Sequence, residues 1–185
     1  MNFIQTAIPG PLVIEPDVFG DRRGFFMETY QQLKFQAGGI EYNFVQDNHS
    51  HSTIGVLRGL HYQIQHTQGK LLRVVNGGVF DVAVDIRKSS EYYGRWVGVT
   101  LTSENKRMFW VPPGFAHGYL TLSEDADVLY KATDYYDPPS ERCIIWNDPT
   151  IGIEWSLEEG VLPVLSGKDQ AGCLLHEAEV FETWL

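Results

Sequence analysis

Short stretches of apolar residues, separated by turn-forming residues, run through most of this 185-residue chain. The clearest case spans Leu71 to Ile86, where Asn76-Gly77-Gly78 separates two such stretches. Asn-Gly supplies the positive φ angles of a tight hairpin turn. After the turn the residues alternate, because Phe80, Val82, Val84 and Ile86 share one face and Asp81 and Asp85 share the other. The pattern predicts two strands joined in a hairpin.

Similar short segments recur along the chain and are bounded by Gly, Pro, Asn and Ser, as is typical of a sandwich or barrel. The predicted strands are Phe3–Ile8, Leu12–Glu15, Phe25–Tyr30, Phe44–Asp47, Val56–Gln63, Leu71–Asn76, Val79–Ile86, Trp96–Thr102, Arg107–Val111, Gly118–Leu122 and Asp127–Thr133. Helical signals are weak, and we expect only short helices at Gln31–Ala37 and Glu177–Trp184. The pattern therefore favours an all-β jelly-roll barrel with short peripheral helices.

Composition narrows the possible functions. The length favours one domain over residues 1–185, and 43% hydrophobic residues are ordinary for a globular protein. The net charge of −10 argues against a nucleic-acid partner, which requires a basic surface. Two cysteines, no membrane-length apolar stretch and no visible signal peptide favour a reduced, cytoplasmic protein without a membrane partner.

Two histidines stand in suggestive frames. His61 and Gln63 lie two residues apart on a predicted strand and therefore point to the same face, and Lys70 follows them. Pro112-x-Gly114-x-x-His117 presents a second histidine after a turn. The two frames resemble the conserved motifs of the cupin superfamily, in which metal-binding members use histidines and a glutamate.

The departures from that pattern argue against a metal. Gln63 stands where a second ligand histidine would be, and Lys70 stands near the position of the glutamate. An ammonium group repels a divalent cation, and a neutral amide is a poor transition-metal ligand. His49 and His51 form a His-x-His pair, but this pair lies outside the frame. A metal-dependent oxygenase that uses His49, His51 and His117 remains the metal-based alternative.

Without a metal, Lys70 could stabilise an oxyanion, and a neutral His61 on the same wall could accept a proton. Together they would suit removal of a proton next to a carbonyl group. The alternative from spacing alone is that His61 is a hydrogen-bonded structural histidine and Lys70 a solvated strand residue.

Longer sequence motifs distinguish these possibilities, because they occur in this order in one protein family. They are Phe19-Gly20-Asp21-Arg22-Arg23-Gly24-Phe25-Phe26-x-Glu28, Phe44-Val45-Gln46-Asp47-Asn48-His49-Ser50, Val56-Leu57-Arg58-Gly59-Leu60-His61-Tyr62-Gln63, Gln68-Gly69-Lys70-Leu71, Phe80 to Arg87, Pro113 to Gly118, Tyr130 to Thr133 with Tyr135-Tyr136, Trp146 to Trp155, and Leu165-Ser166-x-Lys168-Asp169. From about Ile4 to Asp169 the sequence resembles the dTDP-4-dehydrorhamnose 3,5-epimerases, a metal-free branch of the cupins.

The resemblance implies a reaction and its residues. The substrate would be a 4-keto-6-deoxyhexose carried on dTDP, whose ketone acidifies the protons on carbons 3 and 5. His61 would be the base and Asp169 the carboxylate that orients it, while Tyr130 would donate a proton from the opposite face and Lys70 would stabilise the enolate. Asp81 could orient His117 or Lys70, or could be a solvated strand carboxylate. No cofactor is implied.

The resemblance also implies binding residues for the dTDP-sugar. Arginine suits bidentate phosphate contacts, and Tyr136 resembles the aromatic residue that stacks on thymine, although ordinary packing is its alternative. Arg22 is better explained as a surface charge. The implied binding residues are Arg23, Glu28, Gln46, Asp47, Asn48, Arg58, Gln63, His117, Tyr136, Glu141 and Lys168.

Members of this family are dimers in which N-terminal strands of one subunit extend the sheet of the other. We therefore expect residues of about 1–30 to be exchanged in a homodimer, so that Arg23 and Glu28 serve the partner's site. Two functional alternatives stay open at this point. One is an epimerase acting at a single carbon, or a ketoisomerase on the same nucleotide sugar, and the other is a non-catalytic jelly roll that binds nucleotide sugars.

Overall fold

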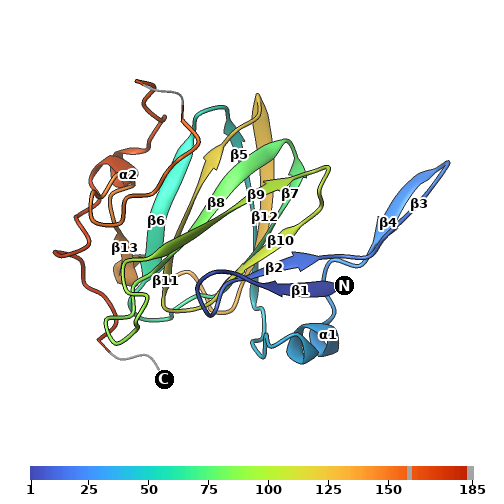
Figure 1. Ribbon diagram of the computed structural model, residues 1–185, viewed down its shortest axis with the longest axis horizontal. Helices are drawn as coiled ribbons and strands as arrows, with labels where there is room; N and C mark the ends of the chain where they lie inside the picture. Colours follow the sequence, from blue (N-terminus) through green and yellow to red (C-terminus); the bar gives the residue numbers. More distant parts are fainter. Residues whose placement is uncertain (158–159, 183–185) are drawn as a thin grey trace.

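The computed structural model describes residues 1–157 and 160–182 (Figure 1). Two antiparallel sheets face each other, and a separate two-stranded hairpin projects from them. In spatial order the six-stranded sheet consists of β1 (Asn2–Gln5), β2 (Leu12–Glu15), β10 (Met108–Val111), β7 (Lys70–Asn76), β12 (Asp125–Ala132) and β5 (Gln46–Thr53). The five-stranded sheet consists of β13 (Glu141–Cys143), β6 (Leu57–Gln63), β11 (Phe115–Thr121), β8 (Gly78–Asp85) and β9 (Trp96–Thr102).

The remaining elements are small. β3 (Val18–Asp21) and β4 (Gly24–Met27) form the projecting hairpin, and α1 (Gln32–Ala37), the 3₁₀ turn η1 (Pro138–Ser140) and α2 (Gly167–Gln170) are the short helices. None of the described helices has the length and apolar character needed to cross a membrane. The cupin-like jelly-roll fold with short peripheral helices is therefore confirmed.

Apolar residues are buried in three layers. The central layer lies between the sheets and includes Leu72, Phe109 and Leu101. The outer face of the five-stranded sheet is covered by the C-terminal segment, whose Ile144 and Leu175 are buried there. The outer face of the six-stranded sheet is covered by α1 and the segment after it, through a cluster of Ile14, Phe35, Ile40, Met108 and Trp110. Both sheets are thus covered on two faces over part of their area.

The prediction that the strands on either side of Asn76-Gly77 pair with each other is wrong. The chain does turn there, and Gly77 has a φ of 70°. However, β7 pairs with β10 and β12, whereas β8 pairs with β11 and β9. The turn is a corner that carries the chain from one sheet to the other. A Cβ atom on Gly77 would lie 2.0 Å from the carbonyl oxygen of Asp125, so glycine is required at this corner.

The alternation predicted for β8 is confirmed, and its two faces lie in different surroundings. Phe80, Val82 and Val84 pack under the C-terminal segment, and the face that carries Asp81 and Asp85 points to the interior of the barrel. Both carboxylates are fully buried. The apolar face of this strand is therefore the outer one, because the barrel interior contains the polar groups described below.

Several predicted bounds are corrected. β5 extends over Gln46–Thr53, well beyond the expected Phe44–Asp47, and β3 and β13 were not predicted. The segment from Glu177 to Glu182 is not helical, and the last residues of that predicted helix, Thr183 and Trp184, lie outside the described residues. The short helix near the C-terminus is instead α2, with Ser166 as its N-cap.

The central layer provides a stability test. Leu72 is 0% exposed between the sheets, whereas Leu33 on α1 is 69% exposed. We expect Leu72→Ala to lower the free energy of unfolding by about 2–5 kcal/mol, because it removes buried methyl groups and leaves a cavity. The matched variant Leu33→Ala should change it by less than about 0.5 kcal/mol. Chemical denaturation followed by circular dichroism measures both, and equal effects would contradict this description of the core.

Candidate functional site

A polar cavity of about 350 Å³ lies between the two sheets. Its lining residues come from both sheets and from the C-terminal segment. They are Gln46, Asn48, Ser50, Arg58, His61, Gln68, Lys70, His117, Tyr119, Tyr130, Tyr136, Glu141 and Lys168. Strands of the five-stranded sheet carry His61 and His117, whereas strands of the six-stranded sheet carry Lys70 and Tyr130. The four groups therefore face the cavity from opposite walls.

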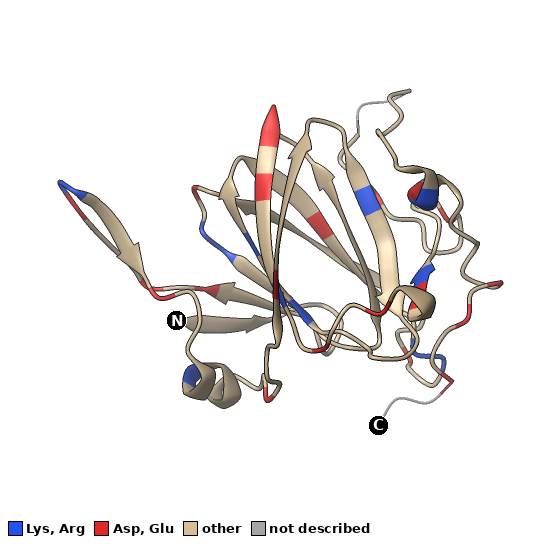
Figure 2. Cartoon of the chain, turned by 180° about the vertical axis from the view of Figure 1, so that it is seen from behind, with Lys and Arg blue, Asp and Glu red and all other residues tan. Residues whose placement is uncertain are grey.

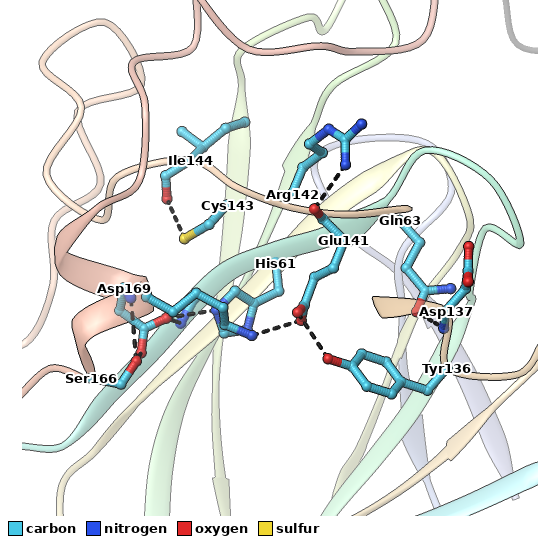
Figure 3. A network of polar contacts seen from close by, with 12 residues as sticks. His61, Gln63, Tyr136, Asp137, Glu141, Arg142, Cys143, Ile144, Ser166 and Asp169 are labelled. Atoms are coloured by element: carbon cyan, nitrogen blue, oxygen red, sulfur yellow. Dashed lines mark hydrogen bonds and ion pairs between the residues drawn. The ribbon is translucent and has the colours of Figure 1, made fainter. Parts of the chain in front are cut away.

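His61 and Asp169 form a hydrogen-bonded pair (Figure 3). His61 Nε2 lies 2.6 Å from Asp169 Oδ1, and Asp169 is only 3% exposed. The same carboxylate accepts hydrogen bonds from the Ser166 hydroxyl at 2.6 Å and from the Gly59 backbone N–H at 3.2 Å. An ionised carboxylate only accepts, so Nε2 of His61 donates and Nδ1 keeps its lone pair.

The surroundings set the charge of this pair. Burial lowers the pKa of His61 below its usual 6.5, against the opposing effect of Asp169, and keeps the imidazole neutral near pH 7. Burial alone would raise the pKa of Asp169, but hydrogen bonds from His61 and Ser166 hold it at about 2. A neutral imidazole fixed by an ionised carboxylate is suited to accept a proton.

Gly59 explains how β6 holds the pair. Its φ is +122°, and a Cβ atom there would lie 2.6 Å from the Cα atom of Gly118 and 2.7 Å from the carbonyl oxygen of His117. The absence of a side chain lets β6 approach β11 closely. This approach places His61 directly opposite His117 in the strand pairing.

Lys70 and Tyr130 face His61 from the other sheet. Burial lowers the pKa of Lys70 to about 8, against the opposing effects of Glu141 and Asp81, so the ammonium form predominates below that pH. Burial also raises the pKa of the Tyr130 phenol above its usual value of 10, which keeps it protonated. The cavity therefore combines a proton acceptor, a proton donor and a cation.

His117 has its own carboxylate partner. Its Nε2 lies 2.8 Å from Asp81 Oδ1, and Asp81 is fully buried. Asp81 was considered as a partner of either His117 or Lys70, and its hydrogen bond is made to His117. Its charge also acts on Lys70, where it opposes the lowering of the pKa by burial. A solvated strand carboxylate is excluded. The second oxygen, Oδ2, has no hydrogen-bond partner in the described part of the chain.

The rim of the cavity carries a chain of polar contacts. Lys168 Nζ lies 2.7 Å from Glu141 Oε1. The Tyr136 hydroxyl donates to Glu141 Oε2 at 3.0 Å (Figure 3). The Gln46 amide accepts from the Tyr136 backbone N–H and donates to Asn48. Tyr136 lines the cavity and is 53% exposed.

Arg58 lies at another part of the rim. Its guanidinium donates to the Ser52 hydroxyl at 3.0 Å and to the His51 carbonyl at 3.2 Å. These contacts fix the side chain beside the cavity. Elsewhere the basic residues lie on several separate elements (Figure 2).

Four of the predicted binding residues do not line this cavity. Arg23 is at the projecting hairpin and pairs with Asp21, and Glu28 pairs with Lys34 at 2.8 Å. Asp47 points to the outer face of β5 and pairs with Lys131 at 2.9 Å. The Gln63 amide bonds to the backbone of His66, Tyr135 and Asp137 instead. Within one chain, Arg23, Glu28 and Asp47 are not brought to the cavity. Gln63 lines an adjoining pocket, which shares His61, Lys70, His117 and Tyr130 with the cavity.

The histidines of the metal-based alternative are also separated. His49 and His51 lie on the outer face of β5, where both contact Asp127, whereas His117 faces the cavity. Sequence reasoning missed Ser50, Gln68 and Tyr119 in the lining and Cys143 beside His61. Ser50 follows Asn48 by two residues, so extending β5 past Asp47 would have placed it on the same face.

A cupin-like barrel whose walls present a proton acceptor, a phenol and a cation to one cavity is suited to move protons. Residues 5–177 match the family model of dTDP-4-dehydrorhamnose 3,5-epimerase. The chain belongs to this family.

Individual relatives agree closely with the family match. A dTDP-4-dehydrorhamnose 3,5-epimerase from Salmonella typhimurium is 58% identical over 184 residues, covering 98% of this chain and all of the relative. One from Pseudomonas aeruginosa is 54% identical over 182 residues, covering 98% and 99%. A crystal structure of the dTDP-6-deoxy-D-glucose-3,5-epimerase from Legionella pneumophila with dTDP-4-keto-L-rhamnose superimposes with a TM-score of 0.95 at 51% identity, covering 100% and 99%.

The histidine–aspartate pair gives a direct prediction for titration. In a ¹⁵N-imidazole NMR titration, His61 should titrate below pH 6.5, because burial disfavours its charged form. Asp169→Asn should lower the pKa of His61 further, since the carboxylate favours the imidazolium. Ser166→Ala keeps the carboxylate and should have the smaller effect. A rise in the pKa of His61 in Asp169→Asn would contradict this electrostatic description.

Proposed function

We propose that the chain converts dTDP-4-dehydro-6-deoxy-D-glucose to dTDP-4-dehydro-L-rhamnose, in the biosynthesis of dTDP-L-rhamnose. The observation that carries the proposal is the placement of His61 and Tyr130 on opposite sheets around one cavity. Epimerisation removes a proton from one face of a carbon and returns a proton to the other face. A base and an acid on opposite walls match that requirement.

Deprotonation begins at His61. The ketone at carbon 4 acidifies the C–H bonds at carbons 3 and 5, and His61 Nδ1 accepts the proton. The electron pair of the broken C–H bond moves into the carbonyl group and forms an enolate. Asp169 holds the imidazole by its hydrogen bond at 2.6 Å and stabilises the imidazolium that forms.

Lys70 and Tyr130 complete the step. The Lys70 ammonium stabilises the negative oxygen of the enolate, as preorganised charge does in other enolate sites. Tyr130 then donates its hydroxyl proton to the opposite face of the carbon. Burial keeps this phenol protonated until the transfer. Each step uses side chains alone, so the proposal includes neither a cofactor nor a catalytic metal.

The dTDP group occupies the rim. Arg58 and Lys168 supply positive charge for the diphosphate, His117 is oriented toward it by Asp81, and Tyr136 stacks on thymine. Gln46, Asn48 and Glu141 supply polar contacts around them. Gln63 supports this rim indirectly, through its hydrogen bonds to the backbone beside Tyr136.

The site is completed by a second copy of the chain in a homodimer. The β3–β4 hairpin extends away from the barrel (Figure 1) and exposes Phe19, Phe25 and Phe26 by 66%, 59% and 70%. Apolar residues this exposed indicate a surface that another chain covers. Arg23 and Glu28 then reach the partner's cavity, whereas Asp47 stays paired with Lys131 on the outer face of β5. The free thiols of Cys143 and Cys173 are consistent with a cytoplasmic location.

Solvent exchange tests the base. Incubation with dTDP-4-dehydro-6-deoxy-D-glucose in deuterated water should introduce deuterium at carbons 3 and 5, as observed by NMR. His61→Ala should slow exchange at both carbons by about 10²–10⁴-fold, because the proton acceptor is lost. The control is His176→Ala, which removes an exposed histidine outside the cavity. Exchange at one carbon only would favour the single-carbon epimerase, and no exchange would favour the binding protein.

Tyr130→Phe tests the proton donor. We expect this variant to exchange protons through His61 but to form inverted product about 10²–10⁴-fold more slowly, because it lacks the hydroxyl. Tyr135→Phe is the control, since Tyr135 is exposed and does not line the cavity. Product stereochemistry is read by NMR, and full epimerisation by Tyr130→Phe would refute the donor role.

Mixed dimers test the exchange of the hairpin. Arg23→Ala and His61→Ala should each be impaired alone, and after mixing and reassociation about a quarter of the wild-type activity should return. Half of the dimers are then mixed, and each has one complete site. Mixing Arg23→Ala with the double variant Arg23→Ala/His61→Ala provides the control without complementation. No recovery in the first mixture would show that the hairpin does not serve the partner's cavity.

A further inference from the structure

Cys143 is a thiol next to the proposed base that the reaction does not use. It lies opposite His61 in the pairing of β13 with β6. The neighbouring residues Leu60 and Ile144 exchange both of their backbone hydrogen bonds. Positions alternate in an antiparallel ladder, so His61 and Cys143 form a non-hydrogen-bonded pair, in which side chains approach more closely.

Three different ligand groups therefore converge at one point. One nitrogen of His61, the sulfur of Cys143 and one oxygen of Asp169 all lie within 4.8 Å of one another. A tetrahedral Zn²⁺ with bonds of about 2.0–2.3 Å separates its ligand atoms by about 3.3–3.8 Å. His61 Nε2 and Asp169 Oδ1, which lie 2.6 Å apart, must separate to about this distance when the ion enters. Imidazole, thiolate and carboxylate are the three ligand types that zinc uses in proteins.

The charge state of the cluster is compatible with a cation. Asp169 is ionised and the His61 imidazole is neutral. Burial raises the pKa of the Cys143 thiol to about 12, so binding must release one proton from sulfur. Lys70 and Lys168 oppose a cation, but Lys168 is paired with Glu141 at 2.7 Å. The second thiol of this region, Cys173, pairs with Ile144 in a parallel bridge and so points to the other face of that strand.

We propose that Zn²⁺ binds reversibly to His61, Cys143 and Asp169 and inhibits the enzyme. The ion takes the place of the proton between His61 Nε2 and Asp169, that proton moves to His61 Nδ1, and the fourth coordination position of the ion faces the cavity. Coordination withdraws electrons from the imidazole and separates it from the carboxylate that orients it. The binding site stands on the geometry alone, whereas the inhibition rests on the proposed role of His61 as the base.

The test uses full-length protein that has been freed of metal with a chelator. Added Co²⁺ should produce a thiolate-to-cobalt charge-transfer absorption in the wild type and in Cys173→Ser but not in Cys143→Ser. Competition with a chromophoric chelator should give one Zn²⁺ per chain and an affinity at least about 100-fold weaker in Cys143→Ser, because even a lost supporting contact costs about 10–100-fold. The wild-type affinity should rise about tenfold per pH unit from pH 6.5 to 7.5, since one thiol proton is released while Lys70, whose pKa is about 8, stays charged.

The rate of each variant in the presence of Zn²⁺ is compared with the rate of the same variant without metal. Zn²⁺ should inhibit the wild type and Cys173→Ser at the same concentration, and excess chelator should restore the rate. Absence of the charge-transfer band in the wild type would overturn the site while leaving the proposed function intact. Binding through Cys143 without inhibition would overturn the inhibition and the assignment of His61 as the base. Should Cys143→Ser fail to fold, the cobalt spectrum of Cys173→Ser decides, because Cys143 is then the remaining thiol.

Discussion

The Asp169 carboxylate is the interaction on which the rest of the site depends. It comes from a four-residue helix in the C-terminal segment, yet it accepts hydrogen bonds from His61 and Gly59 on β6 and from Ser166 at the start of its own helix. A buried carboxylate needs such donors, because an unpartnered charge in the interior is costly. The same contacts orient the imidazole and attach the C-terminal segment to the barrel. Folding of that segment and assembly of the site are therefore coupled.

Much of the architecture could be predicted from local patterns. Alternating short segments indicated the all-β fold, and a cluster of ordered motifs indicated His61, Lys70, Tyr130 and Asp169, three of which line the cavity while the fourth supports it. The pairing of the strands was harder to predict from the sequence. Asn76-Gly77 signals a turn, but a turn does not say whether its two strands pair or belong to different sheets. That choice depends on partners from distant parts of the chain, here β10, β12, β11 and β9.

Features without a hydrophobic signal were missed for a physical reason. β5 has polar side chains on both faces, so its eight residues resemble a loop rather than a strand. Asp81 was expected to face away from the apolar side of β8, and it does, but the side that carries Asp81 points into the barrel, where a histidine pairs with it. Cys143 belongs to a three-residue strand whose partner is set only by tertiary structure. The role of such a residue depends on the groups that it faces in the folded chain.

The outer face of β5 has a consequence for the site on its inner face. Hydrophobic burial normally fixes how one strand aligns with the next, and a slip by one residue exchanges its two faces. β5 has no apolar residue to oppose such a slip, so its alignment on β12 depends on polar contacts. Asp127, which binds both His49 and His51, and Tyr119, which binds Ser50, supply them from opposite sides. The surface histidines thus help to hold the alignment that places Asn48 in the cavity.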